Sequence, residues 1–157
     1  MSKSTSFALP AIFLIAIAGV ILWPMLNPGR STPATHCLSN VKQQVVALVL
    51  YESDWDEHYP VKEWQTSLAK YTKARDFSCD EVTKKGGKDG YAMDWHLLGA
   101  DAQKIADPTR TAVVFETDAL GRDVVANLAA VSVGRHKEGS NFGYADAHAK
   151  WKKRTLP

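Results

Sequence analysis

The sequence predicts an α+β fold in which a long N-terminal helix, membrane-spanning at first and amphipathic beyond, packs on a small antiparallel sheet. Three observations support this fold class: an uncharged apolar run near the N-terminus, helical periodicity after it, and short runs of β-forming residues over the C-terminal half. The chain of 157 residues, 45% hydrophobic and 23% charged, has the composition of a folded protein with one domain and an appendage.

The apolar run extends from Phe7 to Leu26 without a charge. A bilayer core of about 30 Å needs about 20 apolar residues in a helix, and Trp23 suits the headgroup region. We interpret residues 7–26 as a transmembrane signal-anchor helix, preceded by a cytoplasmic tail at residues 1–6. The expected location is the bacterial inner membrane, crossed once, with the C-terminal domain outside the cytoplasm. The alternatives are a buried core helix and a cleaved signal peptide, since residues 16–18 have the small-x-small form of a cleavage site.

The segment after the apolar run is a linker over residues 27–35, rich in proline, glycine and serine. The predicted exported domain covers residues 36–157. Its first element is an amphipathic helix, because one helical stripe carries Leu38, Val41, Val45 and Leu48. A turn at Trp55–Pro60 ends this helix, and a second, shorter helix is expected over residues 61–73.

The periodicity after residue 90 is that of strands. Five runs are rich in β-branched and aromatic residues: YAMDW, TAVVFETD, LAAVSVGRH, NFGYAD and HAKW. Turn-forming residues separate them, as in LGAD, DPTR, LGRD and KEGS. A small antiparallel sheet follows, because these strands do not alternate with helices as a parallel sheet would require.

The charge balance gives no reason to expect nucleic acid as a partner. Nineteen basic against seventeen acidic side chains leave a formal charge of +2, which is too small for that inference. The basic end of the chain, Lys150 to Arg154, is interpreted as a solubilising segment.

The two cysteines, Cys37 and Cys79, belong neither to a Cys-x-x-Cys pair nor to a zinc-type spacing. In an oxidising compartment they would form a disulfide. The alternative is two unrelated buried thiols. We predict the disulfide, which would join the start of the amphipathic helix to the segment before the sheet.

Several motifs together resemble a known family. CLSNVKQQVVALVLYESDWDEHYP is similar to the first helix and turn of bacterial pseudopilin-like proteins, which are related to type IV pilins and to the pseudopilins of type II secretion. That family carries a C-terminal prepilin-type processing-associated motif of histidine, nine residues, aspartate and glycine. Here His136 and Asp146 have this spacing, and NFGYADAHAKW resembles the family's ending. The second cysteine, in FSCDEV, lies where the family has one.

The resemblance implies motif residues at His136, Asn141, Asp146, His148 and Trp151. It implies a structural or accessory component of a secretion or pilus-like system, not an enzyme, whose partners are the membrane and other pilin-like or secretion-system proteins.

Two departures from the family pattern stand out. Ala147 replaces the glycine after the aspartate, and alanine resists a positive φ. The prepilin peptidase site is absent, because Ser6 precedes Phe7 and Ala11 stands where an acidic residue is usual. Cleavage at Phe7 is therefore not expected.

We expect no cofactor. The alternative is a bound metal, for which two sets of side chains are candidates. His136, Asp146 and His148 contain the ligand types of a transition-metal site, and a periplasmic metal-binding module or metal-dependent enzyme is the alternative function. A structural polar cluster is the competing interpretation. Four acids, Glu52, Asp54, Asp56 and Glu57, offer hard oxygens for calcium, but their spacing is not that of an EF-hand loop.

Overall fold

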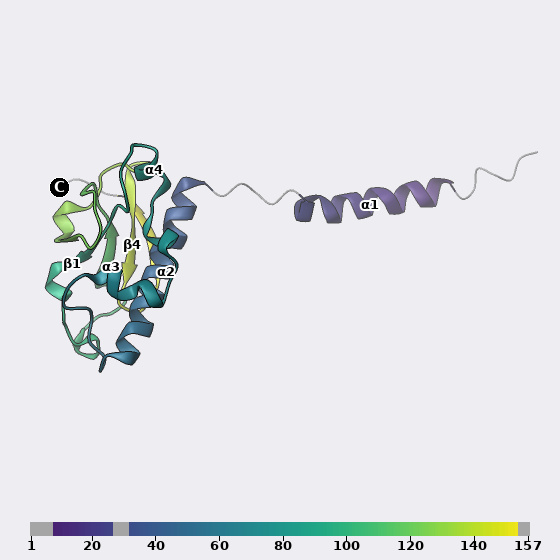
Figure 1. Ribbon diagram of the computed structural model, residues 1–157. Coiled ribbons are helices and arrows are strands. Elements are labelled where there is room, and N and C mark those ends of the chain that lie inside the picture. The colour runs from purple at the N-terminus through teal and green to yellow at the C-terminus, as the bar shows by residue number, and fades with distance from the viewer. Residues whose placement is uncertain (1–7, 27–31, 154–157) are drawn as a thin grey trace, which may run out of the picture. The chain divides into compact units, whose positions relative to one another are not determined.

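The structure is a computed structural model that describes residues 8–26 and 32–153 of the chain. The chain divides into two compact units, Met1–Ser31 and Thr32–Pro157. The described part of the first unit is helix α1 (Ala8–Leu26), and all other elements belong to the second unit (Figure 1).

The prediction of a membrane span is wrong. Within residues 8–26 and 32–153, no helix combines the length and the apolar character needed to cross a bilayer. The transmembrane signal-anchor helix at residues 7–26, and the single-pass inner-membrane location inferred from it, are therefore contradicted. An uncharged run of residues was insufficient evidence for a membrane span.

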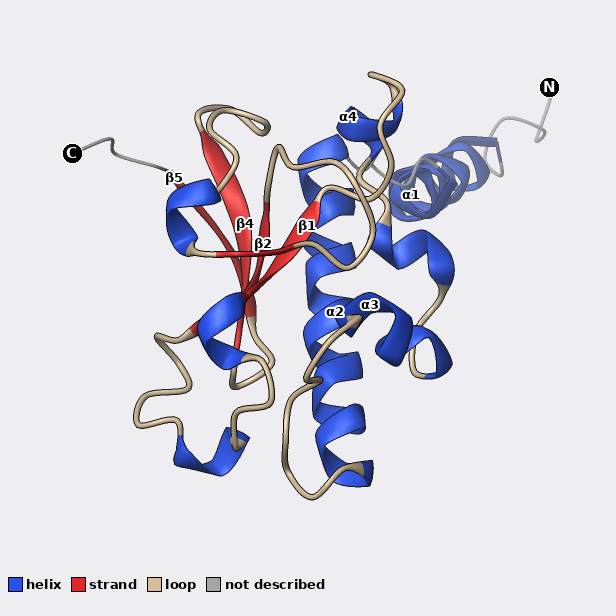
Figure 2. Ribbon diagram, turned by 60° about the vertical axis from the view of Figure 1, so that its left-hand side comes forward, coloured by secondary structure: helices blue, strands red, loops and turns tan. Residues whose placement is uncertain are grey.

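Helix α2 (Pro33–Asp54) is the longest element of the second unit that the structure describes. Its start is fixed by Thr32, whose side-chain oxygen accepts a hydrogen bond from Thr35 N at 3.3 Å, and by Pro33 in the first turn. The stripe of Val41, Val45 and Leu48 is almost fully buried. Helix α2 lies along the sheet, which Figure 2 shows beside it.

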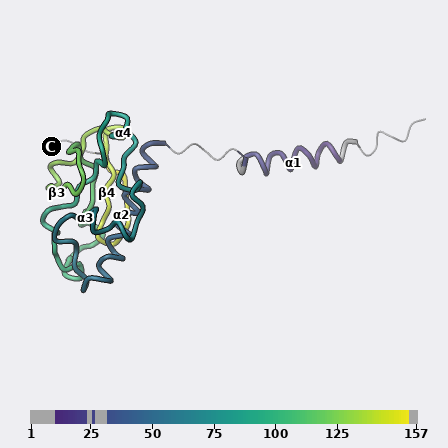
Figure 3. Tube along the Cα trace, in the orientation of Figure 1, coloured from purple at the N-terminus to yellow at the C-terminus, as the bar shows by residue number. Residues whose placement is uncertain are grey.

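The sheet contains five strands in the order β3-β1-β2-β4-β5. Their bounds are β1 Tyr91–Asp94, β2 Ala112–Glu116, β3 Val125–Ala126, β4 Gly139–Tyr144 and β5 Ala149–Lys153. All neighbouring pairs are antiparallel except β1 and β3, which are parallel. Figure 3 follows the chain to the yellow hairpin of β4 and β5.

The predicted fold class is wrong in two respects. No long N-terminal helix packs on the sheet, because the helical residues are divided between α1 and α2, which belong to different units. The sheet is mixed rather than antiparallel, because β3 pairs in parallel with β1. Side-chain contacts hold β3 there: Asp123 Oδ1 accepts from Gln65 N at 2.6 Å, and Trp64 Nε1 donates to Val124 O at 2.8 Å.

Short helices connect the remaining elements. The second predicted helix, residues 61–73, is reduced to α3 (Trp64–Ser67) and the 3-10 turn η1 (Leu68–Lys70), since Glu63 has a left-handed backbone conformation. The others are η2 Ala74–Phe77, α4 Asp80–Thr83, η3 Trp95–Leu97, η4 Ala102–Lys104 and η5 Leu128–Ala130. All of these except η5 contribute residues to the main core, among them Trp64 and Phe77.

The core lies mainly between α2 and one face of the sheet. A register shift between Ala112 and Val114 lets Val113 and Val114 both contribute to this core. The opposite face buries a smaller cluster around Phe115. The polar residue that ends β2, Glu116, is fully buried, and it leads to the candidate site.

Candidate functional site in a buried cysteine, histidine and glutamate cluster

Four segments of the second unit each contribute one buried side chain to a single cluster. Cys37 comes from the first turns of α2, Cys79 precedes α4, Glu116 ends β2, and His136 lies in the turn before β4. We call these four residues the buried cluster. One sulfur, nitrogen or oxygen atom from each lies within 4.8 Å of the others. This is the one group of potential metal ligands found among the residues that the structure describes.

The contacts within the buried cluster form a chain. Cys37 Sγ lies 2.7 Å from Cys79 Sγ, and both cysteines are free. Cys79 Sγ lies 3.9 Å from His136 Nε2, which in turn lies 2.9 Å from Glu116 Oε1. None of the four residues is more than 4% exposed. The structure thus brings together the two cysteines predicted to pair, while the disulfide itself stays a prediction.

Motif residues hold the buried cluster in place. Asn141 donates through its backbone N–H to Glu116 Oε2 at 2.8 Å and through Nδ2 to Glu116 Oε1 at 3.1 Å. The same Nδ2 reaches Ala34 O, in the first turn of α2, at 3.4 Å. Trp151 Nε1 donates to His136 O at 2.9 Å. Three of the five motif residues therefore tie the β4–β5 hairpin to β2 and to the start of α2.

The surroundings shift the pKa values of the cluster members in different directions. A hydrogen bond with Cys37 lowers the pKa of Cys79 to about 5 against the opposing effect of burial, and His136 lowers it further. The same contact and burial raise the pKa of Cys37. Burial alone would lower the pKa of His136, but its contacts with Cys79 and Glu116 outweigh burial and raise that pKa to about 9. The arrangement favours a Cys79 thiolate beside a protonated histidine.

Two buried polar atoms beside the cluster have no hydrogen-bond partner, Tyr91 Oη and Asn141 Oδ1. Tyr91 is fully buried, and its hydroxyl faces Cys37 closely enough to affect the pKa of both groups. Buried polar groups without partners are uncommon in folded proteins.

The other two motif residues lie elsewhere, in the turn between β4 and β5. Asp146 Oδ1 accepts from His148 N at 3.2 Å and lies 2.5 Å from His148 Nδ1, and the ring of His148 stacks on Tyr144. Ala147 between them has φ of 65°, so the replacement of glycine did not prevent the left-handed conformation. The structure does not gather His136 with Asp146 and His148, because His136 faces Glu116 and Cys79 instead.

The four acidic residues at the end of α2 that were candidates for calcium do not form one site either. Glu52 turns inward, with only 8% exposed, and burial raises its pKa to about 7. Asp54 Oδ2 accepts from Tyr71 Oη at 2.6 Å and pairs with Lys70 at 3.5 Å. Asp56 and Glu57 form an exposed turn with positive φ angles.

Sequence reasoning missed Glu116 and Tyr91. Glu116 was counted as part of a strand-forming run, TAVVFETD, and its role depends on a partner that follows it by 20 positions. The one signal available was an acidic residue at the end of an otherwise apolar strand, because an acid that is buried there needs a partner.

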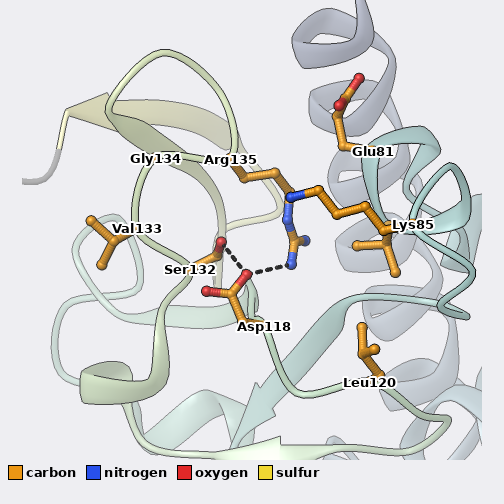
Figure 4. Close-up of a pocket in the computed structure, with 9 residues that line it drawn as sticks. Glu81, Lys85, Asp118, Leu120, Ser132, Val133, Gly134 and Arg135 are labelled. Atoms are coloured by element: carbon orange, nitrogen blue, oxygen red, sulfur yellow. Dashed lines mark hydrogen bonds and ion pairs between the residues drawn. The ribbon is translucent and has the colours of Figure 1, made fainter.

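A separate pocket of about 420 Å³ is lined in part by residues 132–135, the segment that leads to His136 (Figure 4). Arg135 points toward it from that segment, but the guanidinium is already held by Gly90 O, Thr117 O and Asp118. Figure 4 also shows the bond from Ser132 to Asp118. The guanidinium is therefore engaged within the chain, and Lys85 is the other basic residue that lines the pocket.

Comparison with protein-family models, with curated proteins and with solved structures finds no match for this chain.

Proposed function

We propose that this protein is a non-enzymatic, pilin-like component of a secretion or pilus-type assembly, and that it acts through contacts with other proteins of that assembly. The proposal rests on the resemblance of residues 36–151 to pseudopilin-like proteins and on the use that the fold makes of the motif residues.

The observation that carries the proposal is that the motif is occupied with holding the fold together. His136, Asn141 and Trp151 connect the β4–β5 hairpin to β2 and α2, and Asp146 and His148 order the turn. Catalysis requires groups that reach a bound substrate. Cys79, Glu116 and His136 are instead almost fully buried, which supports a structural role for the motif.

The experiment is chemical crosslinking of the full chain in its source bacterium, followed by identification of the crosslinked proteins. We expect pilin-like or secretion-system subunits to be recovered. Two matched variants report on the role of the fold. Asp146→Ala should retain the partners, because it alters an exposed pair, whereas Glu116→Ala should lose them, because it disrupts the buried cluster.

A chain that turns over a small-molecule substrate, or that crosslinks to no pilin-like or secretion-system protein, would contradict the proposal.

A further inference from the structure

The buried cluster has the composition of a structural metal site. Zinc in proteins is held by four ligands drawn from cysteine sulfur, histidine nitrogen and carboxylate oxygen, with bond lengths of about 2.0–2.3 Å. Cys37, Cys79, His136 and Glu116 supply two sulfurs, one nitrogen and one oxygen, all buried. Ligand types, number and burial therefore agree with a closed, four-coordinate site.

The distances also agree with such a site after small side-chain movements. Bond lengths of this size in a tetrahedron place ligand atoms about 3.3–3.8 Å from one another. The Cys79 Sγ to His136 Nε2 distance of 3.9 Å already lies near this range. The two sulfurs, at 2.7 Å, and the His136–Glu116 pair, at 2.9 Å, would each separate by roughly 1 Å or less to admit an ion.

The surroundings of the cluster point to a ligand as well. Tyr91 Oη faces Cys37, and a metal-bound Cys37 thiolate would accept a hydrogen bond from this hydroxyl. Asn141 fixes both oxygens of Glu116, as outer residues commonly fix a metal-bound carboxylate. Among the described residues, Glu116 has no lysine or arginine partner, so its buried charge is opposed by His136 alone.

A groove borders the buried cluster at His136 and Asn141. A groove of about 310 Å³ is bordered by the first turns of α2 and by Trp151, and His136 and Asn141 line it. His136 is the member of the buried cluster that lines this groove.

We propose that the reduced chain binds one zinc ion through Cys37, Cys79, His136 and Glu116. The ion displaces the proton of the Cys37 thiol and the proton that His136 Nε2 carries, and it links α2, the segment before α4, β2 and the turn before β4. The four side chains fill a tetrahedral site and leave no coordination position for a substrate, so the ion has a structural role. The site is independent of the proposed function, since a structural ion would stabilise this fold whatever its partners are.

Zinc binding and the predicted disulfide exclude each other, because both use both sulfurs. Which form exists therefore depends on the redox state of the compartment. The experiment must begin with fully reduced protein.

The test uses the full chain, purified with a reductant and freed of metal, and titrated with Zn²⁺ and with Co²⁺ as a spectroscopic substitute. We expect one ion per chain, cobalt absorption bands of a tetrahedral site with thiolate charge transfer, and protection of both cysteines from alkylation by zinc. Asn141→Ala should weaken binding by about 10–100-fold, the effect usual for a residue that supports a ligand. The Asp146→Asn/His148→Gln double variant should bind as the unchanged chain does.

Three results would overturn the proposal: no stoichiometric binding by the reduced chain, unchanged affinity in Cys37→Ser, or a sulfur–sulfur bond that stays closed under reductant. If Cys37→Ser fails to fold, the cobalt spectrum of the unchanged chain decides, because a site without thiolates gives no charge-transfer bands.

Discussion

Two histidine–carboxylate pairs of this chain lie in different environments. His136 Nε2 is 2.9 Å from Glu116, and the two side chains are 2% and 0% exposed. His148 Nδ1 is 2.5 Å from Asp146, and these side chains are 39% and 30% exposed. The contact distances are similar, whereas water reaches only the second pair. Burial, more than the identity of the partners, therefore determines how much each pair matters to the fold.

The largest difference should appear when the carboxylate of the buried pair is removed. Glu116→Ala leaves His136 and the amide of Asn141 without their acceptor in a region closed to water. We expect a loss of about 3–5 kcal/mol in the free energy of unfolding, measured by denaturant titration. A loss as small as that of Asp146→Ala would remove the distinction between the two pairs.

A second variant tests how closely α2 packs on the sheet. Gly143 lies in β4 where a Cβ atom would collide with Val45 and would come within 2.9 Å of Val41 Cγ1. Gly143→Ala should therefore destabilise the fold by about 1–3 kcal/mol. Adding Val45→Ala should recover part of the loss, and a thermal melt that shows no recovery would place the collision elsewhere.

Glu52 sharpens the comparison because it is a buried carboxyl group without a histidine. Burial, together with the nearby Glu57, raises its pKa from 4.5 to about 7. The fold thus favours the protonated form, so its contribution to stability is complete below about pH 4.5 and is lost as the pH rises through 7. Glu52→Gln should remove this dependence.

The measurement for Glu52 is denaturant unfolding of both chains at about pH 5 and pH 8. Glu52→Gln should gain about 1–3 kcal/mol relative to the unchanged chain between these two conditions. If the free energy of unfolding changed equally with pH in the two chains, the fold would not disfavour the ionised form of Glu52, and the prediction would be wrong.

The backbone of the exposed turn offers a change in the opposite direction. Ala147 has φ of 65°, a conformation that glycine adopts without a steric penalty. Ala147→Gly should stabilise the fold by about 1 kcal/mol. A calorimetric melting temperature below that of the unchanged chain would mean that the methyl group makes a contact worth more than the strain.

The smallest effect is expected for the exposed pair. Bonds from His148 hold the pKa of Asp146 below its ordinary value, although burial acts in the other direction. The pair is accessible to water, so Asp146→Ala should cost less than about 1 kcal/mol. A loss of several kcal/mol in denaturant titration would show that this turn organises the hairpin as a whole.

Local patterns predicted many of the elements but not their arrangement. Four of the predicted runs each overlap one strand of the structure: YAMDW, TAVVFETD, NFGYAD and HAKW. They could be predicted because alternation and β-branching are local properties. LAAVSVGRH became η5 and isolated bridges at Val131 and His136. Strand β3 has only two residues and depends on Asp123 and Trp64, so no pattern in its own sequence could indicate it.

The candidate site shows the same limit. The motif spacing drew attention to His136, and the two cysteines were expected to meet. The sequence did not identify the partner of Glu116, because His136 is brought to it by the pairing of β2 with β4. His136, Asp146 and His148 were grouped by ligand type, whereas in the structure Asp146 and His148 lie in the turn between β4 and β5 and His136 lies before β4.

The placement of β5 at one end of the sheet has a consequence for self-association. An edge strand offers unpaired backbone groups on which another chain can add a strand, and lysines along such an edge oppose this addition. Strand β5 carries Lys150, Lys152 and Lys153, and two copies aligned edge to edge would bring six ammonium groups together. The opposite edge, β3, is only two residues long. Both ends of the sheet therefore oppose the addition of a strand from another chain and growth into fibres.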